Sequence, residues 1–558
     1  MLHMPGGDDT ALHRLRASSA LLEPPDLLLS GVRVLNVFSG QTSPRDVGVT
    51  SGRIAWLALP GEVPRRIRNT EQLDLSGCLA VPGLIEPHAH AELIYGPLAL
   101  AAAAGEHGTT TLCCDMLTFT AVLDDDELLR LQQGCEAAPV RMLWALRASA
   151  EGGGDVAQRL SATRLIALME RLPSIISVGE MTAWRDLVDG DSRLGAIVRA
   201  ARCRRMRVNG HAPGASQRSL QRIAVSGVSD DHEATTAAEA MLRLDNGFWV
   251  MVRHSSLRPD ARRILAGLLD SERPLTRVML TTDGPVAADL VNGHLDIVVR
   301  EAIAAGIGAI DAIRMATINP ATYLGLDGYI GSLSPGRYAD IAIVSDLENF
   351  SVESVLVGGR PPASAPNYPP GLQGRELVEA GLTASQLREL LDRAPAARLD
   401  GLLTRALESR GAGDAIAALV ARDGSWIVVM SIANLELDAL ASSYSGSGDI
   451  LLIGQDLDLV AECYHRMMRS GPGIATPRRF LPLPLLGSLS LLPVSDLAAI
   501  IHELSADIHL RAGDIPFEFL LLFLGLGVLP DRRLTPGGVL EVKSGKILAA
   551  PTRLAPNS

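Results

Sequence analysis

The chain has few of the residues that form cross-links, and it lacks long apolar runs. Its six cysteines contain no Cys-x-x-Cys pair, and we expect them to be buried, reduced thiols of a cytoplasmic protein. The most apolar run, Phe519–Leu529, has 11 residues. A run of this length is too short to cross a bilayer as a helix, so it predicts a buried core segment.

Targeting signals and an excess of basic residues are also missing. Residues 1–26 mix acidic and basic side chains without an apolar core, so we expect no signal peptide. The net charge of −12 argues against nucleic acid or an anionic membrane as the main partner. Glycine-rich phosphate loops and Ser-His-Asp triads are absent as well. We therefore expect a cytoplasmic protein that acts on a small molecule and forms a homo-oligomer, a dimer.

The pattern along the chain predicts an α/β protein of several domains. A length of 558 residues exceeds one hydrophobic core. Short strand-like segments within 26–80 return at 331–365 and predict one small β-sandwich domain built from both segments. Between them, residues 81–330 alternate strand-like and helical segments, which is typical of a (β/α)₈ TIM-like barrel. A Pro-rich linker at 361–371 leads to an expected α+β domain at 378–558.

Potential metal ligands follow the strand-like runs of the predicted barrel. Residues two apart in a strand point to the same face, so the two histidines of the run PGLIEPHAH can reach one ion. Four later side chains each follow another apolar run, where barrel enzymes carry their catalytic groups. Any one of them could be an ordinary polar residue at the end of a strand, but their joint placement favours a metal site. The six candidates are His88, His90, Glu180, His211, His232 and Asp283.

Several motifs in order carry a family resemblance. The runs AVPGLIEPHAHAE, HGTTTLCCD, GEMTAW, NGHAPG, GVSDDHEATT and MATINPATYLGL together resemble the adenine deaminase family of the amidohydrolase superfamily. The likeness covers most of residues 27–360 and extends more faintly into the C-terminal third. It implies two divalent metal ions, manganese or iron first and zinc as an alternative. It also implies a role in purine salvage through conversion of adenine and water to hypoxanthine and ammonia.

The resemblance assigns the ligands to two ions. His88 and His90 would hold one ion, and His211 and His232 would hold the other. Glu180 would bridge the two, at the place where many relatives use a carboxylated lysine.

Three acidic residues are the candidate catalytic groups. Asp283 would bind a metal and act as general base, accepting a proton from a metal-bridging water that becomes the attacking hydroxide. The ring nitrogen of the substrate must then be protonated. Glu92 matches a glutamate of the first family motif and is favoured for this step. Glu233 is the other candidate, although it could instead orient a histidine.

The residues that would hold a substrate depart most from the family pattern. We take Asp115, Arg253 and Ser256 as candidate substrate-binding residues. The sequence RHSS at Arg253–Ser256 replaces Arg-Glu-Gly-Ser, and Gly284 stands where the family often has a second aspartate. The loop 442–449, SSYSGSGD, lacks the histidine expected there. The first alternative is therefore the same metal site acting on another aminopurine, a pterin or a cyclic amide. The second is a non-catalytic homologue with a binding role.

Overall fold

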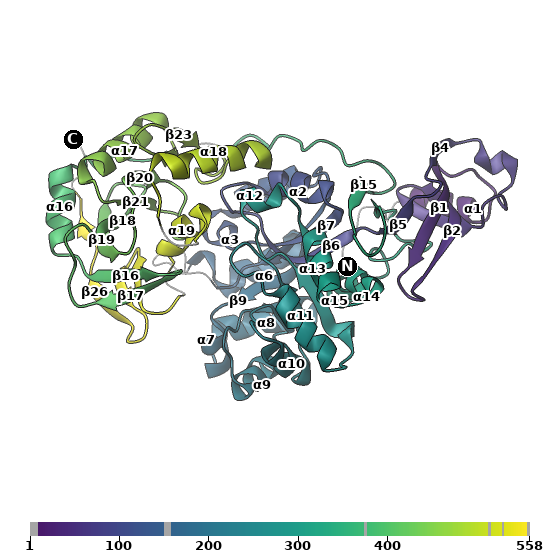
Figure 1. Cartoon of the computed structure of the whole chain (residues 1–558), viewed down its shortest axis with the longest axis horizontal. Coiled ribbons are helices and arrows are strands. Elements are labelled where there is room, and N and C mark those ends of the chain that lie inside the picture. The colour runs from purple at the N-terminus through teal and green to yellow at the C-terminus, as the bar shows by residue number, and fades with distance from the viewer. Residues whose placement is uncertain (1–8, 150–157, 373–375, 512–514, 527–528, 555–558) are drawn as a thin grey trace.

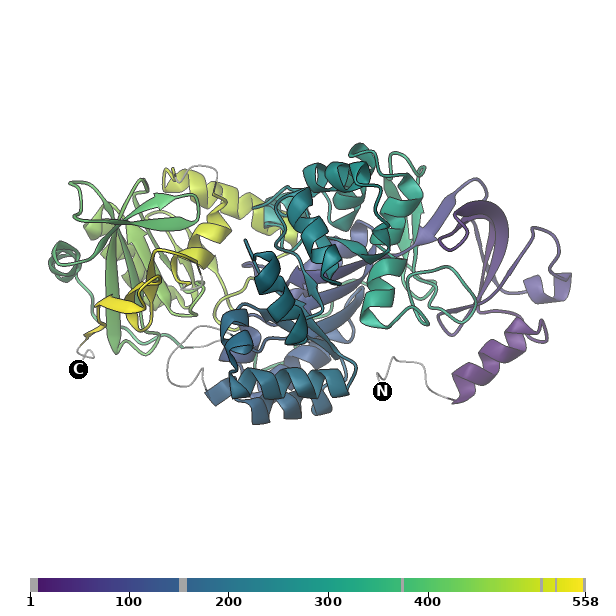
Figure 2. The same ribbon diagram turned by 90° about the horizontal axis from the view of Figure 1, so that it is seen from below.

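The computed structural model describes residues 9–149, 158–372, 376–511, 515–526 and 529–554, and its architecture confirms the predicted fold class. Three parts lie in a row: a central barrel, a small β domain at one end and a C-terminal domain at the other (Figures 1 and 2). The first eight residues of the N-terminal stretch, and Gly527 and Val528 of the apolar run, lie outside the described residues.

The central part is a closed barrel of parallel strands. Five strands form one sheet in the order β10-β9-β8-β7-β6, and three form another in the order β11-β12-β13. β13 lies beside β6 and β10 beside β11, so the two sheets close into one ring. The strands are β6 (Leu84–His90), β7 (Thr109–Asp115), β8 (Arg141–Leu146), β9 (Ile175–Met181), β10 (Arg207–Gly210), β11 (Asp230–Asp231), β12 (Trp249–Arg253) and β13 (Val278–Thr281).

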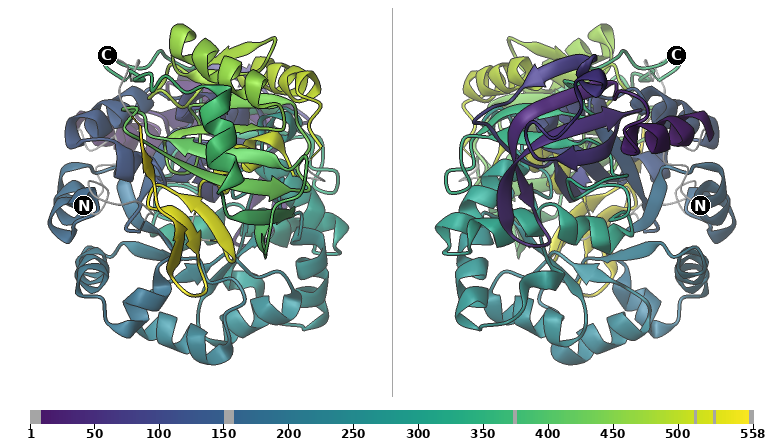
Figure 3. Two further views of the ribbon diagram at one scale, coloured as in Figure 1. Left: turned by 90° about the vertical axis from the view of Figure 1, so that its left-hand side faces the viewer. Right: turned by 90° about the vertical axis from the view of Figure 1, so that its right-hand side faces the viewer.

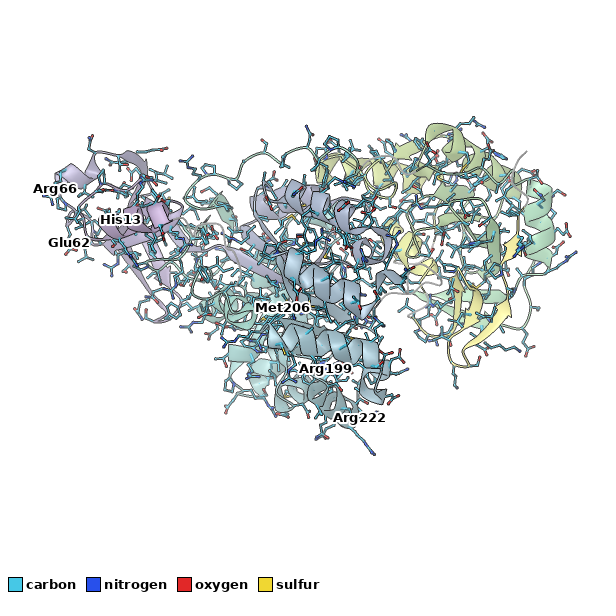
Figure 4. All side chains as sticks on the ribbon, turned by 180° about the vertical axis from the view of Figure 1, so that it is seen from behind. His13, Glu62, Arg66, Arg199, Met206 and Arg222 are labelled. Atoms are coloured by element: carbon cyan, nitrogen blue, oxygen red, sulfur yellow. The ribbon has the colours of Figure 1, made fainter. Side chains whose placement is uncertain are left out.

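Helices follow the strands and surround them, as the end-on views of Figure 3 show. Their buried positions recur at helical spacing, for example Leu194, Ile197, Val198 and Ala201 of α8. The barrel helices are α2 (Pro97–Glu106), α4 (Asp125–Cys135), α6 (Ala162–Arg171), α8 (Ser192–Cys203), α9 (Gln217–Val225), α10 (Ala237–Asp245), α11 (Ala261–Asp270), α13 (Leu295–Ala304), α14 (Ala309–Met315) and α15 (Ile318–Leu324), with shorter α3 (Phe119–Val122), α7 (Trp184–Asp189) and α12 (Ala287–Leu290). Arg199 and Arg222 lie on the outer helices α8 and α9 (Figure 4).

The interior of the barrel is filled by side chains from different strands. One buried cluster contains Ile85, Cys113, Leu143, Ile176, Met251 and Met279. This packing closes the inside of the ring. The polar residues at the carboxyl ends of the strands therefore lie at the rim rather than in a channel.

The small β domain is built from two segments that lie far apart in the sequence. All its strands belong to one continuous seven-stranded sheet in the order β15-β14-β5-β1-β2-β3, with β4 paired to β1. The helix α1 (Asp9–Ser19) packs against β2 and β3. The strands are β1 (Leu27–Asn36), β2 (Gln41–Thr50), β3 (Arg53–Ala58), β4 (Glu71–Asp74), β5 (Leu79–Pro82), β14 (Ile341–Val344) and β15 (Val352–Leu356).

The C-terminal domain is built on a nine-stranded sheet, and a smaller three-stranded sheet lies beside it. The first contains β16 (Ala396–Asp400), β17 (Leu403–Leu407), β18 (Ala415–Val420), β19 (Trp426–Ala433), β20 (Ala439–Ser442), β21 (Ile450–Gly454), β22 (Gly473–Ala475), β23 (Phe480–Pro482) and β27 (Thr552–Arg553), and the second β24 (Arg532–Thr535), β25 (Gly538–Glu541) and β26 (Lys546–Ala549). The helices are α16 (Ala384–Asp392), α17 (Leu457–Ser470), α18 (Val494–Asp507) and α19 (Phe517–Leu524).

This domain contacts the barrel at the rim formed by the carboxyl ends of the strands. Ser490 donates its backbone N–H to the carbonyl of Ile94, which follows β6, at 2.6 Å. Glu518 of α19 accepts a hydrogen bond from Ala287 N, after β13, at 3.4 Å. α18 also packs against α12 and α2. The C-terminal domain therefore covers part of the rim where the candidate ligands lie.

The cysteines and the apolar run behave largely as expected. All six cysteines are free thiols, and Cys113, Cys114, Cys135 and Cys463 are buried. Cys203 is exposed at the end of α8, so the expectation of burial is wrong for this residue. The described part of the apolar run lies mainly in the buried helix α19. Across the described parts of the chain, the helices are too short or too polar to span a membrane.

Candidate metal centre

The six predicted ligands lie together at the carboxyl-end rim of the barrel. His88 and His90 are on β6 and Glu180 is on β9. The other three follow β10, β11 and β13 directly or within two residues: His211, His232 and Asp283. Their ligand atoms form two groups, one of His88, His90, Glu180 and Asp283, and one of Glu180, His211 and His232. Glu180 is common to both groups.

The Glu180 carboxylate stands at the centre of the cluster. Its Oε1 lies 3.0 Å from His88 Nε2, 3.4 Å from His90 Nε2 and 3.3 Å from His232 Nε2. Its Oε2 lies 3.6 Å from His211 Nδ1. The two carboxylate oxygens thus face different histidines, which is the arrangement a bridging ligand requires.

The unpaired atoms and the charge of the cluster fit a divalent metal ion. His211 Nδ1 and both ring nitrogens of His232 are buried and make no hydrogen bond within the described residues, although buried polar atoms normally have a partner. Burial lowers the pKa of His88, but Asp283 and Glu180 raise it more strongly, to about 10. The carboxylates therefore favour positive charge at the centre. Imidazole and carboxylate donors suit Mn, Fe and Zn alike.

Glu180 is held by residues at the ends of two neighbouring strands. Asp115 Oδ2 accepts a hydrogen bond from Glu180 N at 2.8 Å. A β-carbon at Gly179 would collide with this same Asp115 oxygen, so glycine is needed there. Arg147, after β8, donates to Glu180 Oε2 at 2.6 Å and lies 3.2 Å from Asp115 Oδ2. Burial raises the pKa of Glu180, but Arg147 and the histidines outweigh it and hold this pKa well below its usual range.

Asp283 has an unusual backbone conformation next to the ligand histidines. Its φ is +62°, in the left-handed region that costs energy for a non-glycine residue. Its Oδ1 lies 3.3 Å from His88 Nε2 and 3.5 Å from His90 Nε2. The following residue, Gly284, has φ +152°, and a β-carbon there would lie 3.0 Å from Leu93 Cδ1. The glycine therefore lets this loop approach β6 closely.

Arg253 and Ser256, the candidate substrate-binding residues, make hydrogen bonds to other parts of the protein. Arg253 Nη1 donates to Glu233 Oε1 at 2.5 Å and to Asp283 Oδ2 at 3.0 Å. Ser256 Oγ accepts a hydrogen bond from Val286 N at 2.9 Å. The bonds of Arg253 hold the two carboxylates, and the bond of Ser256 holds the loop after β13. Asp115 likewise contacts Glu180 and Arg147.

A cavity lies beside the cluster, between the barrel and the C-terminal domain. Glu92 reaches it from the loop after β6, and its Oε1 lies 3.2 Å from His90 Nδ1. Glu92 Oε2 is buried without a hydrogen-bond partner in the described chain. Burial raises the pKa of Glu92 despite the opposing effect of His90. The lining comprises Glu92, Thr118, Phe119, Val122, Leu123, Arg422, Tyr444, Ser445, Gly448, Leu486, Ser488 and Leu489.

Several residues of the site were not found from the sequence. Arg147 follows an ordinary strand-like run and gives no signal of its own. Glu86, in the run PGLIEPHAH, is fully buried and accepts hydrogen bonds from Thr281 Oγ1 at 2.6 Å and Thr282 N at 2.8 Å. These bonds join β6 to β13 beneath the cluster. An acidic residue inside an apolar run is the signal that could have revealed Glu86.

Comparisons with known proteins find two family matches and several relatives. Residues 79–361 match the amidohydrolase family, and residues 409–546 match the adenine deaminase C-terminal domain. A provisionally named adenine deaminase from Bacillus cereus is 31% identical, with 95% of this chain and 94% of that protein covered. An adenine deaminase from Deinococcus deserti is 29% identical, with 94% and 96% covered. A solved adenosine deaminase from Xanthomonas campestris with bound zinc is 20% identical, with a TM-score of 0.44 and 61% and 93% covered.

The barrel with its rim of histidines and carboxylates therefore defines a hydrolase of the metal-dependent type. The chain belongs to the amidohydrolase family and, within it, to the adenine deaminase family.

Proposed function

We propose that this protein hydrolyses adenine to hypoxanthine and ammonia. The observation that carries the proposal is the position of Glu92, which lines the cavity and whose Oε1 lies 3.2 Å from Nδ1 of the candidate ligand His90. A potential proton donor thus lies between this cavity and the potential metal centre. The names of the relatives from Bacillus cereus and Deinococcus deserti support adenine as the substrate.

The six cluster residues would hold two divalent ions, with Glu180 shared between them. Bound there, the ions would supply activation of water at neutral pH. Manganese or iron is our first choice and zinc the alternative, because the donor set accommodates all three.

Asp283 is suited to accept a proton from the attacking water. Burial raises its pKa, but His88, His90 and Arg253 lower it to well below the usual range. The carboxylate is therefore ionised at neutral pH. Arg253 fixes one carboxylate oxygen and leaves Oδ1 on the side of the histidines. We assign Asp283 as the general base on these contacts.

Glu92 is better suited than Glu233 to protonate the ring nitrogen. Burial raises the pKa of Glu92, which favours the protonated form that a donor needs. Glu233 is opposite in character: His211 and Arg253 outweigh burial and lower its pKa to about 2. It is also ion-paired with Arg253. We therefore assign Glu233 to hold Arg253 in place beside Asp283.

A different substrate for the same centre has one specific observation in its favour. The loop 442–449 forms part of the cavity wall through Tyr444, Ser445 and Gly448, and it has no histidine. The cavity wall therefore differs from the pattern expected from the family resemblance. This difference supports another aminopurine, a pterin or a cyclic amide as the alternative substrate, since specificity is set by the pocket rather than the fold. A cytoplasmic location, a part in purine salvage and a dimer remain predictions.

The proposal is tested by ammonia release from the purified protein after manganese loading. Adenine should yield stoichiometric hypoxanthine and ammonia, and Asp283→Asn should abolish turnover. Exposed Asp311→Asn, on α14, is the matched control and should retain the full rate. A panel of aminopurines, pterins and cyclic amides identifies the substrate if adenine is inert. A metal-loaded protein inert toward the entire panel would rule out both functions.

A further inference from the structure

The cavity beside the metal centre has one wall from each domain. Glu92, Phe119 and Leu123 line it from the barrel, while Tyr444 and Leu489 line it from the C-terminal domain. Apolar side chains therefore flank a few polar groups, as in sites for small organic molecules. A flat heterocycle bound there would touch both domains.

Tyr444 contributes an unused hydrogen-bonding group to this cavity. The residue is only 3% exposed, and its hydroxyl is buried with no hydrogen-bond partner anywhere in the described residues. Glu92 Oε2, on the opposite wall, is in the same situation. Leaving a buried polar group unpaired is costly, and a ligand in the cavity would provide the missing partners.

The loop that carries Tyr444 is fixed by its own hydrogen bonds. Tyr444 N donates to Ser442 Oγ at 3.0 Å, and this hydroxyl donates to the Tyr444 carbonyl at 2.8 Å. Arg422 donates to the carbonyl of Ser443 at 2.6 Å and to that of Gly448. The ring of Tyr444 is thus presented from a backbone held on both sides, which lowers the cost of ordering it around a ligand.

The tyrosine is a donor over the working pH range. Burial, with the nearby Glu92 and Glu518 carboxylates, raises the pKa of Tyr444 well above its usual range. The hydroxyl therefore keeps its proton and can donate a hydrogen bond to a ring nitrogen.

We propose that Tyr444 is a specificity-determining residue whose hydroxyl donates a hydrogen bond to N3 or N7 of the purine, while the amino-bearing edge of the ring faces Glu92. The inference rests on the proposed deamination of adenine. It gives the C-terminal domain a direct part in substrate recognition, at a loop without the histidine that the family resemblance led us to expect.

The test compares Tyr444→Phe with wild type on adenine, 3-deazaadenine and 7-deazaadenine. The substitution removes one oxygen, and we expect kcat/KM for adenine to fall about tenfold, the effect of one lost hydrogen bond. For the deaza analogue that lacks the accepting nitrogen, kcat/KM should be the same for Tyr444→Phe and wild type. For the other analogue, the substitution should lower kcat/KM about as much as it does for adenine. Tyr464→Phe removes a buried hydroxyl of α17 outside the cavity, and its kcat/KM should stay at the wild-type value. Inhibition constants replace kcat/KM for an analogue that is not turned over.

Binding of hypoxanthine, measured by calorimetry, separates this inference from the proposed function. Suppose that wild type deaminates adenine, but that Tyr444→Phe has the same kcat/KM or loses equally on adenine and both deaza analogues. The role of Tyr444 is then overturned and the proposed function stands. If wild type releases no ammonia but binds hypoxanthine about tenfold more tightly than Tyr444→Phe, the reaction is wrong and the recognition role stands. Equal binding by the two proteins, or none by wild type, overturns the role of Tyr444.

Discussion

Asp115 Oδ2 accepts a hydrogen bond from the backbone N–H of Glu180 at 2.8 Å, so the end of β7 fixes the central carboxylate carried by β9. Arg147 completes the contact by pairing with both acids. The position of the shared ligand therefore depends on three successive strands of the barrel. The glycine before Glu180 is what allows the carboxylate of Asp115 to approach.

Gly179→Ala should damage the metal centre without touching a ligand. The added β-carbon would collide with Asp115 Oδ2, so either Asp115 or the Glu180 backbone must move. We expect metal content to fall, and kcat to fall about 100-fold, because small misplacements of catalytic groups have effects of this size. Elemental analysis and ammonia release measure the two quantities. Gly308→Ala is the matched control, since a β-carbon there meets open space; equal behaviour of the two variants would contradict the argument.

Arg253→Lys should distinguish a positioning residue from a substrate-binding one. Arg253 Nη1 bridges Glu233 and Asp283, and the flexible side chain of lysine cannot hold a donor at this position as firmly as the rigid guanidinium does. We expect kcat to fall about 100-fold with KM nearly unchanged, because Asp283 loses its fixed orientation. Arg262→Lys, at an exposed pair with Glu301, is the control. A raised KM with an unchanged kcat would instead support the substrate-binding role predicted from the sequence.

The sequence predicted which side chains gather at the rim better than it predicted the surroundings of these side chains. His88 and Glu180 lie near the carboxyl ends of apolar strands and Asp283 follows one, and the strand ends of a parallel barrel share one rim. The local sequence pattern is therefore enough to predict that such residues lie close together. The direction in which Arg253 points depends on acids that follow β11 and β13, and no pattern near Arg253 encodes it.

The C-terminal wall of the cavity was beyond prediction for a related reason. Tyr444 lies more than 300 residues after Glu92 in the chain, and the two line one cavity only because the C-terminal domain packs on the barrel rim. A short loop of serines and glycines gives no periodic signal. Only the missing histidine marked the loop 442–449 as altered.

Glu92→Gln should abolish proton donation while leaving the metals in place. Glu92 is not among the clustered ligand residues, so metal content should match that of wild type. General acid catalysis contributes about 100- to 10,000-fold, and kcat should fall within this range. Elemental analysis with steady-state kinetics provides both values. Exposed Glu106→Gln, at the end of α2, is the control. A Glu92→Gln variant with wild-type kcat would return the donor role to Glu233.

Glu518→Gln should remove a pH-dependent loss of stability where the two domains meet. Burial raises the pKa of Glu518 from 4.5 to about 7. Between these values the folded chain keeps a proton that the unfolded chain has released, so stability falls as pH rises through this window and stays low above it. A shift of this size corresponds to roughly 3 kcal/mol. Glutamine retains the acceptor for Ala287 N without titrating. The Tm advantage of Glu518→Gln over wild type should therefore widen from pH 5 to pH 8 in thermal unfolding, whereas exposed Glu408→Gln should follow wild type. An advantage that is constant with pH would show that ionisation of Glu518 does not govern this contact.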